Sequence, residues 1–200
     1  MPAPHWIHSA ATRWACTGVA LVAAACAPLS PKPAKTSEAP PVAAACPPAL
    51  AALARCLAGQ DSAGAYYLIA MPHQWNGHLV LHAHGGPALG APRPERSAAD
   101  LERWAIMVKA GYAWAGSTFR QGGVEVRAAA EDTERLRQIF VGHVAQPRRT
   151  ILHGQSWGAS VAARGAEMFT STTQGQRPYD AVLLTSGVLA GGSRSYDFRT

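Results

Sequence analysis

The sequence predicts an α/β fold in which a mostly parallel sheet carries helices on both faces. From residue 64 onward, short apolar segments alternate with longer segments of helical periodicity, as expected for strands joined by helical crossovers. The middle strand segments are continuous apolar runs, which is typical of parallel strands buried on both faces. With 200 residues, 48% of them hydrophobic, the chain can bury the core of one ordinary domain.

The strand segments share an apolar run that ends at a Gly, Pro or polar turn signal. We expect strands at residues 65–70, 78–83, 112–119, 150–153 and 181–185. We expect helices from a capping box at Ser97 and Asp100 to Gly111, from about residue 127 to Pro147, and from the turn at residue 158 to about residue 170. A shorter helical pattern covers residues 49–57.

The first 26 residues resemble a secretory signal. Arg13 precedes an apolar stretch that ends in small residues at 23–25. The stretch is too short to span a membrane as a helix, which needs about 20 apolar residues. Two interpretations stay open: a plain exported protein, or a bacterial lipoprotein lipidated on Cys26, although Ala23 stands where such signals usually have Leu. Both predict export to the periplasm, to a bacterial membrane surface or to the medium.

Residues 27–48 contain seven prolines and predict an extended linker, so that the folded domain is expected at 49–200. Export permits disulfides. Cys46 and Cys56 flank the short helical pattern, and they can pair only if the chain turns back between them. Otherwise one of them pairs with a cysteine elsewhere.

The first chemical motif is Gly154-Gln155-Ser156-Trp157-Gly158, between a strand and a helix. A tight turn of this form strains the serine backbone and projects its hydroxyl at the carboxyl end of the sheet. Glycines two residues before and after remove side chains that would collide. The motif predicts Ser156 as a nucleophile, with the helix amino terminus directed at the developing negative charge.

The second motif is His84-Gly85-Gly86-Pro87, after the strand at 78–83. Acyl transfer needs hydrogen-bond donors for an oxyanion. We expect one donor to be the amide of Trp157 and another to be the amide of Gly86 or Gly85, since Pro87 has no amide hydrogen. A plain glycine turn is the alternative interpretation.

Together these residues resemble the α/β-hydrolase superfamily over about residues 64–190. The pairing of His-Gly-Gly-Pro with Gly-x-Ser-Trp-Gly is similar to that of proline iminopeptidase-like serine peptidases, and exported esterases use similar pieces. The resemblance implies a Ser-His-acid mechanism through an acyl-enzyme, with no metal or organic cofactor.

The sequence departs from this family because no histidine follows Ser156. His84, His143 and His153 are better explained as structural residues. Asp197 is the candidate acid, since it follows the strand at 181–185. We therefore expect a sheet that is incomplete at the carboxyl terminus, in a chain that is a fragment and is inactive alone.

Two functions stay open at this point. The first is a serine hydrolase acting on a small ester or peptide substrate. The second is a non-catalytic binding module or surface lipoprotein with the same fold. The net charge is +6, but the basic residues are scattered, which argues against a nucleic-acid partner.

Overall fold

The computed structural model describes residues 36–189, except 87, 123–124 and 173–174. These residues form a seven-stranded sheet with the order β1-β2-β3-β5-β4-β6-β7. The strands are β1 (Val42–Ala44), β2 (Ala54–Gln60), β3 (Tyr66–Pro72), β4 (His78–Ala83), β5 (Ala113–Ser117), β6 (Arg149–Gln155) and β7 (Ala181–Thr185). Every strand expected from the sequence is therefore present, with shifts of one to two residues at some ends.

The predicted parallel sheet is confirmed for its central and later strands. β5, β4, β6 and β7 run parallel in that order, whereas β3 is antiparallel to both β2 and β5. Strands β4 and β6 pair directly although β5 lies between them in the sequence, so their carboxyl ends lie side by side. The segments after them carry the two predicted motifs.

The helices are α1 (Glu95–Arg103), α2 (Ala105–Lys109), α3 (Val126–His143) and α4 (Trp157–Met168). The single helix expected between β4 and β5 is divided in two at Trp104, whose backbone leaves the helical region. The predicted capping box is wrong, because the helix begins at Glu95 and Ser97 is buried within its first turn. The predicted apolar stripe is nevertheless buried at Leu101 and Val108.

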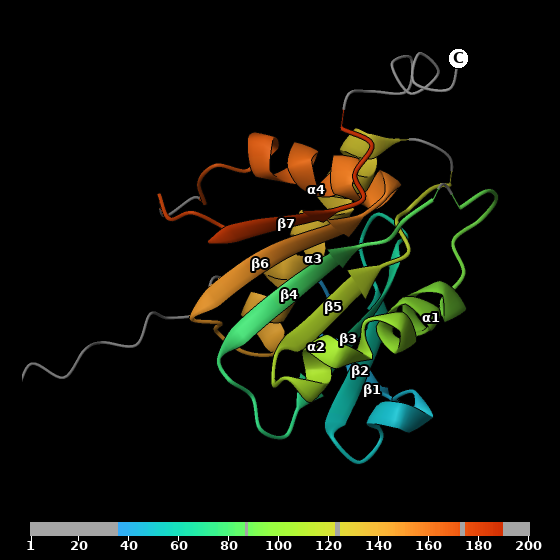
Figure 1. The fold of residues 1–200 in the computed structure, drawn as a ribbon, viewed down its shortest axis with the longest axis vertical. Helices are drawn as coiled ribbons and strands as arrows, with labels where there is room; N and C mark the ends of the chain where they lie inside the picture. Colours follow the sequence, from blue (N-terminus) through green and yellow to red (C-terminus); the bar gives the residue numbers. More distant parts are fainter. Residues whose placement is uncertain (1–35, 87, 123–124, 173–174, 190–200) are drawn as a thin grey trace, which may run out of the picture. The chain divides into compact units, whose positions relative to one another are not determined.

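The helices cover both faces of the sheet, as predicted. Figure 1 shows α1 and α2 on one face and α3 on the other. The α3 and α4 face packs Ile139, Phe140, Leu152 and Ala162 against the strands. The other face centres on Trp114, with apolar residues of α1 and α2 around it. Both faces of β4 are buried, which explains its continuous apolar sequence.

The helix expected over residues 49–57 is wrong. One 3-10 turn, η1 (Pro48–Leu50), reverses the chain, and β2 then pairs with β3 along its whole length. Alanine and leucine favour a helix locally, but pairing with a formed strand outweighs that preference. The alternation of buried Ala54 and Cys56 with exposed Arg55 was the strand signal.

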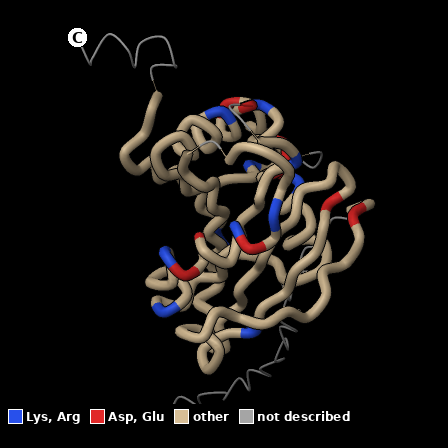
Figure 2. Tube along the Cα trace, turned by 90° about the vertical axis from the view of Figure 1, so that its right-hand side faces the viewer, with Lys and Arg blue, Asp and Glu red and all other residues tan. Residues whose placement is uncertain are grey.

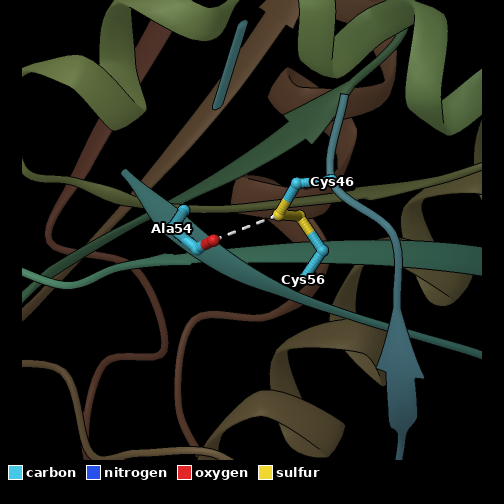
Figure 3. The surroundings of a disulfide bond; sticks show 3 residues. All are labelled: Cys46, Ala54 and Cys56. Carbon is cyan, nitrogen blue, oxygen red and sulfur yellow. Dashed lines mark hydrogen bonds between the residues drawn. A yellow bond between two sulfur atoms is a disulfide. The ribbon is translucent and has the colours of Figure 1, made fainter. Parts of the chain in front are cut away.

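This reversal allows the pairing of Cys46 with Cys56, which form a disulfide with their Cα atoms 5.2 Å apart (Figure 3). The bond joins the segment after β1 to β2. Cys46 Sγ also lies 3.4 Å from the carbonyl oxygen of Ala54. Because a disulfide sulfur carries no proton, this is a packing contact.

The linker prediction also needs correction near its end. Residues 42–44 form strand β1, which pairs antiparallel with β2. Glu38 is held as well: its carboxylate accepts hydrogen bonds from the amide and hydroxyl of Ser62, and it lies 3.5 Å from Arg135. The folded domain thus begins before residue 49, because an extended proline-containing segment can add an edge strand. The predicted signal at 1–26, with Cys26, lies outside the described residues.

Charged residues are interspersed on the described part of the chain. Figure 2 shows basic and acidic segments of the tube close to one another. Many of them form ion pairs, including Arg137 with Glu134 and Arg149 with Asp180. The two end strands carry exposed apolar side chains, at Val42 on β1 and at Val182 and Leu183 on β7.

Candidate active site

Ser156 lies in a strained turn between β6 and α4. Its backbone angles are φ 55° and ψ −122°, in a region that residues with a side chain rarely adopt. We call residues 154–158 the serine turn. A Cβ on Gly154 would lie 2.6 Å from the carbonyl carbon of Gly158, and one on Gly158 would lie 2.5 Å from the carbonyl oxygen of His84. Both glycines are therefore sterically required, for the reason predicted from the sequence.

The hydroxyl of Ser156 is not used to cap the helix that follows. Its backbone is instead fixed from β7, because its amide donates to the carbonyl oxygen of Thr185 at 2.8 Å. Trp157 is the first residue of α4, and amides in a first helical turn have no acceptor within the helix. This amide and the partial positive charge of the helix terminus provide donors beside the serine.

Residues 84–86, which we call the glycine loop, pack directly against the serine turn. A Cβ on Gly85 would lie 2.9 Å from the carbonyl oxygen of Gln155 and 3.3 Å from Cβ of Ser156. Arg96 of α1 holds the loop, since its guanidinium donates to the Gly85 carbonyl at 2.8 Å and to Asp100. Gly86 adopts φ 69°, a conformation that favours glycine. The structure thus brings Gly85 beside Ser156.

Residues with positive φ follow four neighbouring strands at their carboxyl ends, and three of these residues are not glycine. Gly86 follows β4, Phe119 follows β5 with φ 61°, Ser156 follows β6, and Ser186 follows β7 with φ 48°. Phe119, Ser156 and Ser186 are the non-glycine residues with positive φ in the part of the chain that the structure describes. Such conformations cost free energy and gather at functional sites. The carboxyl ends of β5, β4, β6 and β7 are therefore the candidate site.

Aromatic rings line the site beside the glycine loop. The imidazole of His84 stacks on Phe119 with ring centres 4.4 Å apart, and the ring of Trp157 meets Phe119 edge to face at 6.0 Å. His84 is buried, and this burial, together with the positive charge of Arg96, lowers the pKa of its imidazole. The neutral, stacked His84 also has its Nδ1 3.3 Å from the carbonyl oxygen of Gly85, and among the described residues it makes no hydrogen bond to the Ser156 hydroxyl.

Beneath the site, two buried histidines are hydrogen-bonded to each other. Nδ1 of His82, on β4, lies 2.9 Å from Nδ1 of His153, on β6. Burial lowers the pKa of His82 well below its usual value and that of His153 to about 4. Both imidazoles are therefore neutral at pH 7.

The described residues do not supply the whole of a Ser-His-acid group. Within them, no hydrogen bond joins the Ser156 hydroxyl to a histidine or a carboxylate. Asp197, the predicted acid, lies outside the described residues. Asp180 lies before β7 and pairs with Arg149 at the amino-terminal ends of β6 and β7, away from Ser156. Over the same described residues, no group of acidic, His or Cys side chains could hold a metal ion. Their helices are also too short or too polar to cross a bilayer.

Solved structures of esterases align with this fold. An esterase from the bacterial hormone-sensitive lipase family aligns with a TM-score of 0.51 and 19% identity, covering 67% of this chain and 44% of that one. A mutant of the esterase E40 gives the same values. The chain has an α/β-hydrolase fold. It spans less than half the length of these α/β-hydrolases. No family model and no curated protein matches the sequence.

Several residues at this candidate site were not foreseen from the sequence. The strain at Phe119 and Ser186 left no signal, because neither residue type favours positive φ. The bond between His82 and His153 had a weak signal: each is a polar residue inside an apolar strand segment, near a motif. The hydrogen bond from Arg96 to the glycine loop could not be predicted, because it depends on how α1 packs against the sheet.

Proposed function

We propose that this protein is a serine hydrolase that cleaves an ester or amide bond through an acyl-enzyme on Ser156. The observation that carries the proposal is the strained serine turn packed against the glycine loop, with both motif glycines sterically required. Backbone strain of this kind persists only where the surrounding structure enforces it, and it is concentrated at functional sites. Ser156 lies at the carboxyl ends of the parallel strands, which is where α/β folds bind their ligands.

In the proposed reaction, Ser156 Oγ attacks the substrate carbonyl carbon while its proton passes to a general base. The carbonyl oxygen becomes an oxyanion that accepts hydrogen bonds from the amide of Trp157 and from an amide of Gly85 or Gly86. Collapse of this intermediate expels an alcohol or amine, which takes up the proton. Water then releases the acid and restores the hydroxyl. We propose that the base and its carboxylate partner come from outside residues 36–189, with Asp197 a candidate for the acid.

An ester is the preferred substrate class in this proposal. Two solved structures that align at a TM-score of 0.51 are esterases, which favours an acyl ester over a peptide. A peptide substrate, as in proline iminopeptidase-like enzymes, remains the second outcome of the test below.

The test is hydrolysis by the full-length protein of a matched set of p-nitrophenyl esters and p-nitroanilide amides. We expect turnover of short acyl esters that is lost in Ser156→Ala and kept in Ser171→Ala, since Ser171 is an exposed serine away from the site. Loss of a nucleophilic serine typically reduces kcat by about 10⁶-fold. Turnover that survives Ser156→Ala would refute the proposal.

A non-catalytic binding module is the second candidate. It is favoured by one observation: no described histidine is hydrogen-bonded to Ser156. A full-length protein that is folded, yet inert towards both substrate series and towards a fluorophosphonate probe, would support this candidate in place of the first.

We further propose that the protein is exported, with lipidation of Cys26 as one form of attachment. The disulfide between Cys46 and Cys56 supports export, because such bonds persist in oxidising compartments. Detergent phase partition should move the native protein, and not a Cys26→Ala variant, into the detergent phase if Cys26 is lipidated. Recovery of both proteins in the aqueous phase would leave a plain exported protein.

A further inference from the structure

The two segments of the proposed site leave the sheet from adjacent strands, and one side-chain hydrogen bond joins those strands below them. His82 lies two residues before the glycine loop, and His153 lies three residues before Ser156. The two residues are direct partners in the β4–β6 register. Their Nδ1 atoms are 2.9 Å apart, and their ring centres are 4.9 Å apart with the ring planes inclined by 29°.

The neighbouring threonine determines which imidazole donates. The hydroxyl of Thr185 donates to the carbonyl oxygen of Gly154 at 3.1 Å, since a carbonyl can only accept. The oxygen of the same hydroxyl lies 3.4 Å from Nε2 of His153 and therefore accepts from it. A neutral His153 with its proton on Nε2 has a lone pair on Nδ1, so His82 must donate from its own Nδ1.

This bond is lost when both rings are protonated, because it needs a lone pair on one of the two Nδ1 atoms. If both were protonated, two N–H donors would face each other across 2.9 Å, and two positive charges would share a site that water does not reach. The surroundings offer little negative charge to compensate, because the carboxylate of Asp100 on α1 is paired with Arg96 at 3.1 Å. His82 faces Trp104 and Trp114, together with the positive charges of Arg96 and Arg103 on α1.

The other groups beside the pair include a histidine, a tryptophan ring and a threonine hydroxyl. His84, the first residue after β4, adds to the electrostatic cost of charging His82. The rings of Trp104 and His153 lie nearly perpendicular with their centres 4.5 Å apart, and Thr185 on β7 lies beside Nε2 of His153. Burial holds the pKa of His153 at about 4, in agreement with this geometry.

We propose that His82 and His153 are a positioning pair, whose neutral hydrogen bond holds the glycine loop and the serine turn in register with each other. The proposal rests on the proposed function for its effect on the reaction, because the register sets where the oxyanion donors lie relative to Ser156. The pair touches no substrate. It acts by fastening the strands from which the two segments emerge.

The arrangement of protons is tested without any catalysis, by nitrogen NMR of the protein with labelled histidines. We expect His153 to carry its proton on Nε2 and His82 on Nδ1 at pH 7, and both rings to stay neutral at about pH 5.5. A proton on Nε2 of His82, or protonation of both rings near pH 6.5, would overturn the proposal whether or not the protein is a hydrolase.

The positioning effect is tested by the rate of fluorophosphonate labelling of Ser156 in the full-length protein. His82→Leu removes the donor, and we expect the maximal labelling rate to fall about tenfold or more, with little change in the probe concentration for half-maximal rate, because ångström-scale misplacement can cost a hundredfold. His153→Asn keeps an acceptor near the Nδ1 position and should retain labelling within about threefold. The exposed His73→Asn is the matched control.

Equal labelling of native protein and His82→Leu would overturn the proposal, as would a loss in His153→Asn as large as that in His82→Leu. Circular dichroism of each variant shows whether it is folded. If native protein is not labelled at all, the proposed hydrolase function fails, and the NMR result alone decides the pair.

Discussion

Removing the disulfide between Cys46 and Cys56 should lower the free energy of unfolding by an amount that the structure allows us to estimate. The bond closes a loop with a sequence separation of 10. In the chain-entropy description, a loop of this length restricts the unfolded chain by about 2.7 kcal/mol at 25 °C. A change of this size should shift the melting temperature by about 5–10 °C in a domain of this size.

The measurement is urea unfolding of a protein in which Cys16 and Cys26 are replaced by serine, with and without the further change of Cys46 and Cys56 to serine. Addition of dithiothreitol is the internal control. It should lower the stability of the first protein to that of the second and leave the second unchanged. Identical unfolding curves for the two oxidised proteins would refute the reasoning, because they would mean that the loop is not constrained by this bond.

Three further predictions concern the buried residues around the site. The pKa of His153 is about 4 in the folded state and about 6.5 in the unfolded state, so the unfolded state binds the proton first as the pH falls. The contribution of His153 to the free energy of unfolding should be fully present above about pH 6.5 and should fall by about 2 kcal/mol between pH 7 and pH 5. Urea unfolding at both pH values measures this, and an unchanged midpoint would contradict it. Gly158→Ala should cost about 3 kcal/mol, because its methyl group would meet the backbone oxygen of His84, and a native melting temperature would show that the turn can open. Phe140→Ala should cost about 3–5 kcal/mol in chemical denaturation, since the ring is fully buried and packs edge to face on Trp75; a cost below about 1 kcal/mol would mean that the core collapses to fill the space.

Strand β4 could be predicted from the sequence because a strand buried on both faces needs a continuous apolar run, and β7 has a similar run although Val182 and Leu183 are exposed. Residues 78–83 and 181–185 were predicted with the same bounds as β4 and β7. The glycines of the serine turn were also predictable, since their spacing around Ser156 reflects a steric need that only glycine satisfies.

The amino-terminal strands could not be predicted in this way, because they depend on partners that are distant in the sequence. β1 has one partner, β2, and β2 gains its register from β3. The alanines and leucine near residue 50 favour a helix when considered alone. The disulfide needed knowledge of that same chain reversal, which the two cysteine positions do not contain.

The candidate site was predictable at its motifs and not at its supports. The sequence left Gly85 and Gly86 as alternative donors, and the structure distinguishes them by place: Gly85 packs on the serine turn, whereas Gly86 takes the left-handed turn. The hydrogen bond between His82 and His153 joins residues 71 positions apart. Such a contact follows from strand order, which composition and periodicity do not determine.

Covalent labelling tests the central claim most directly. The full-length protein is treated with a fluorophosphonate probe, digested, and the modified peptide is sequenced by mass spectrometry. We predict one adduct, on Ser156, absent from Ser156→Ala and retained in Ser171→Ala. A folded protein that takes up no probe, or one that carries the adduct on a different serine, would contradict the assignment of Ser156 as the nucleophile.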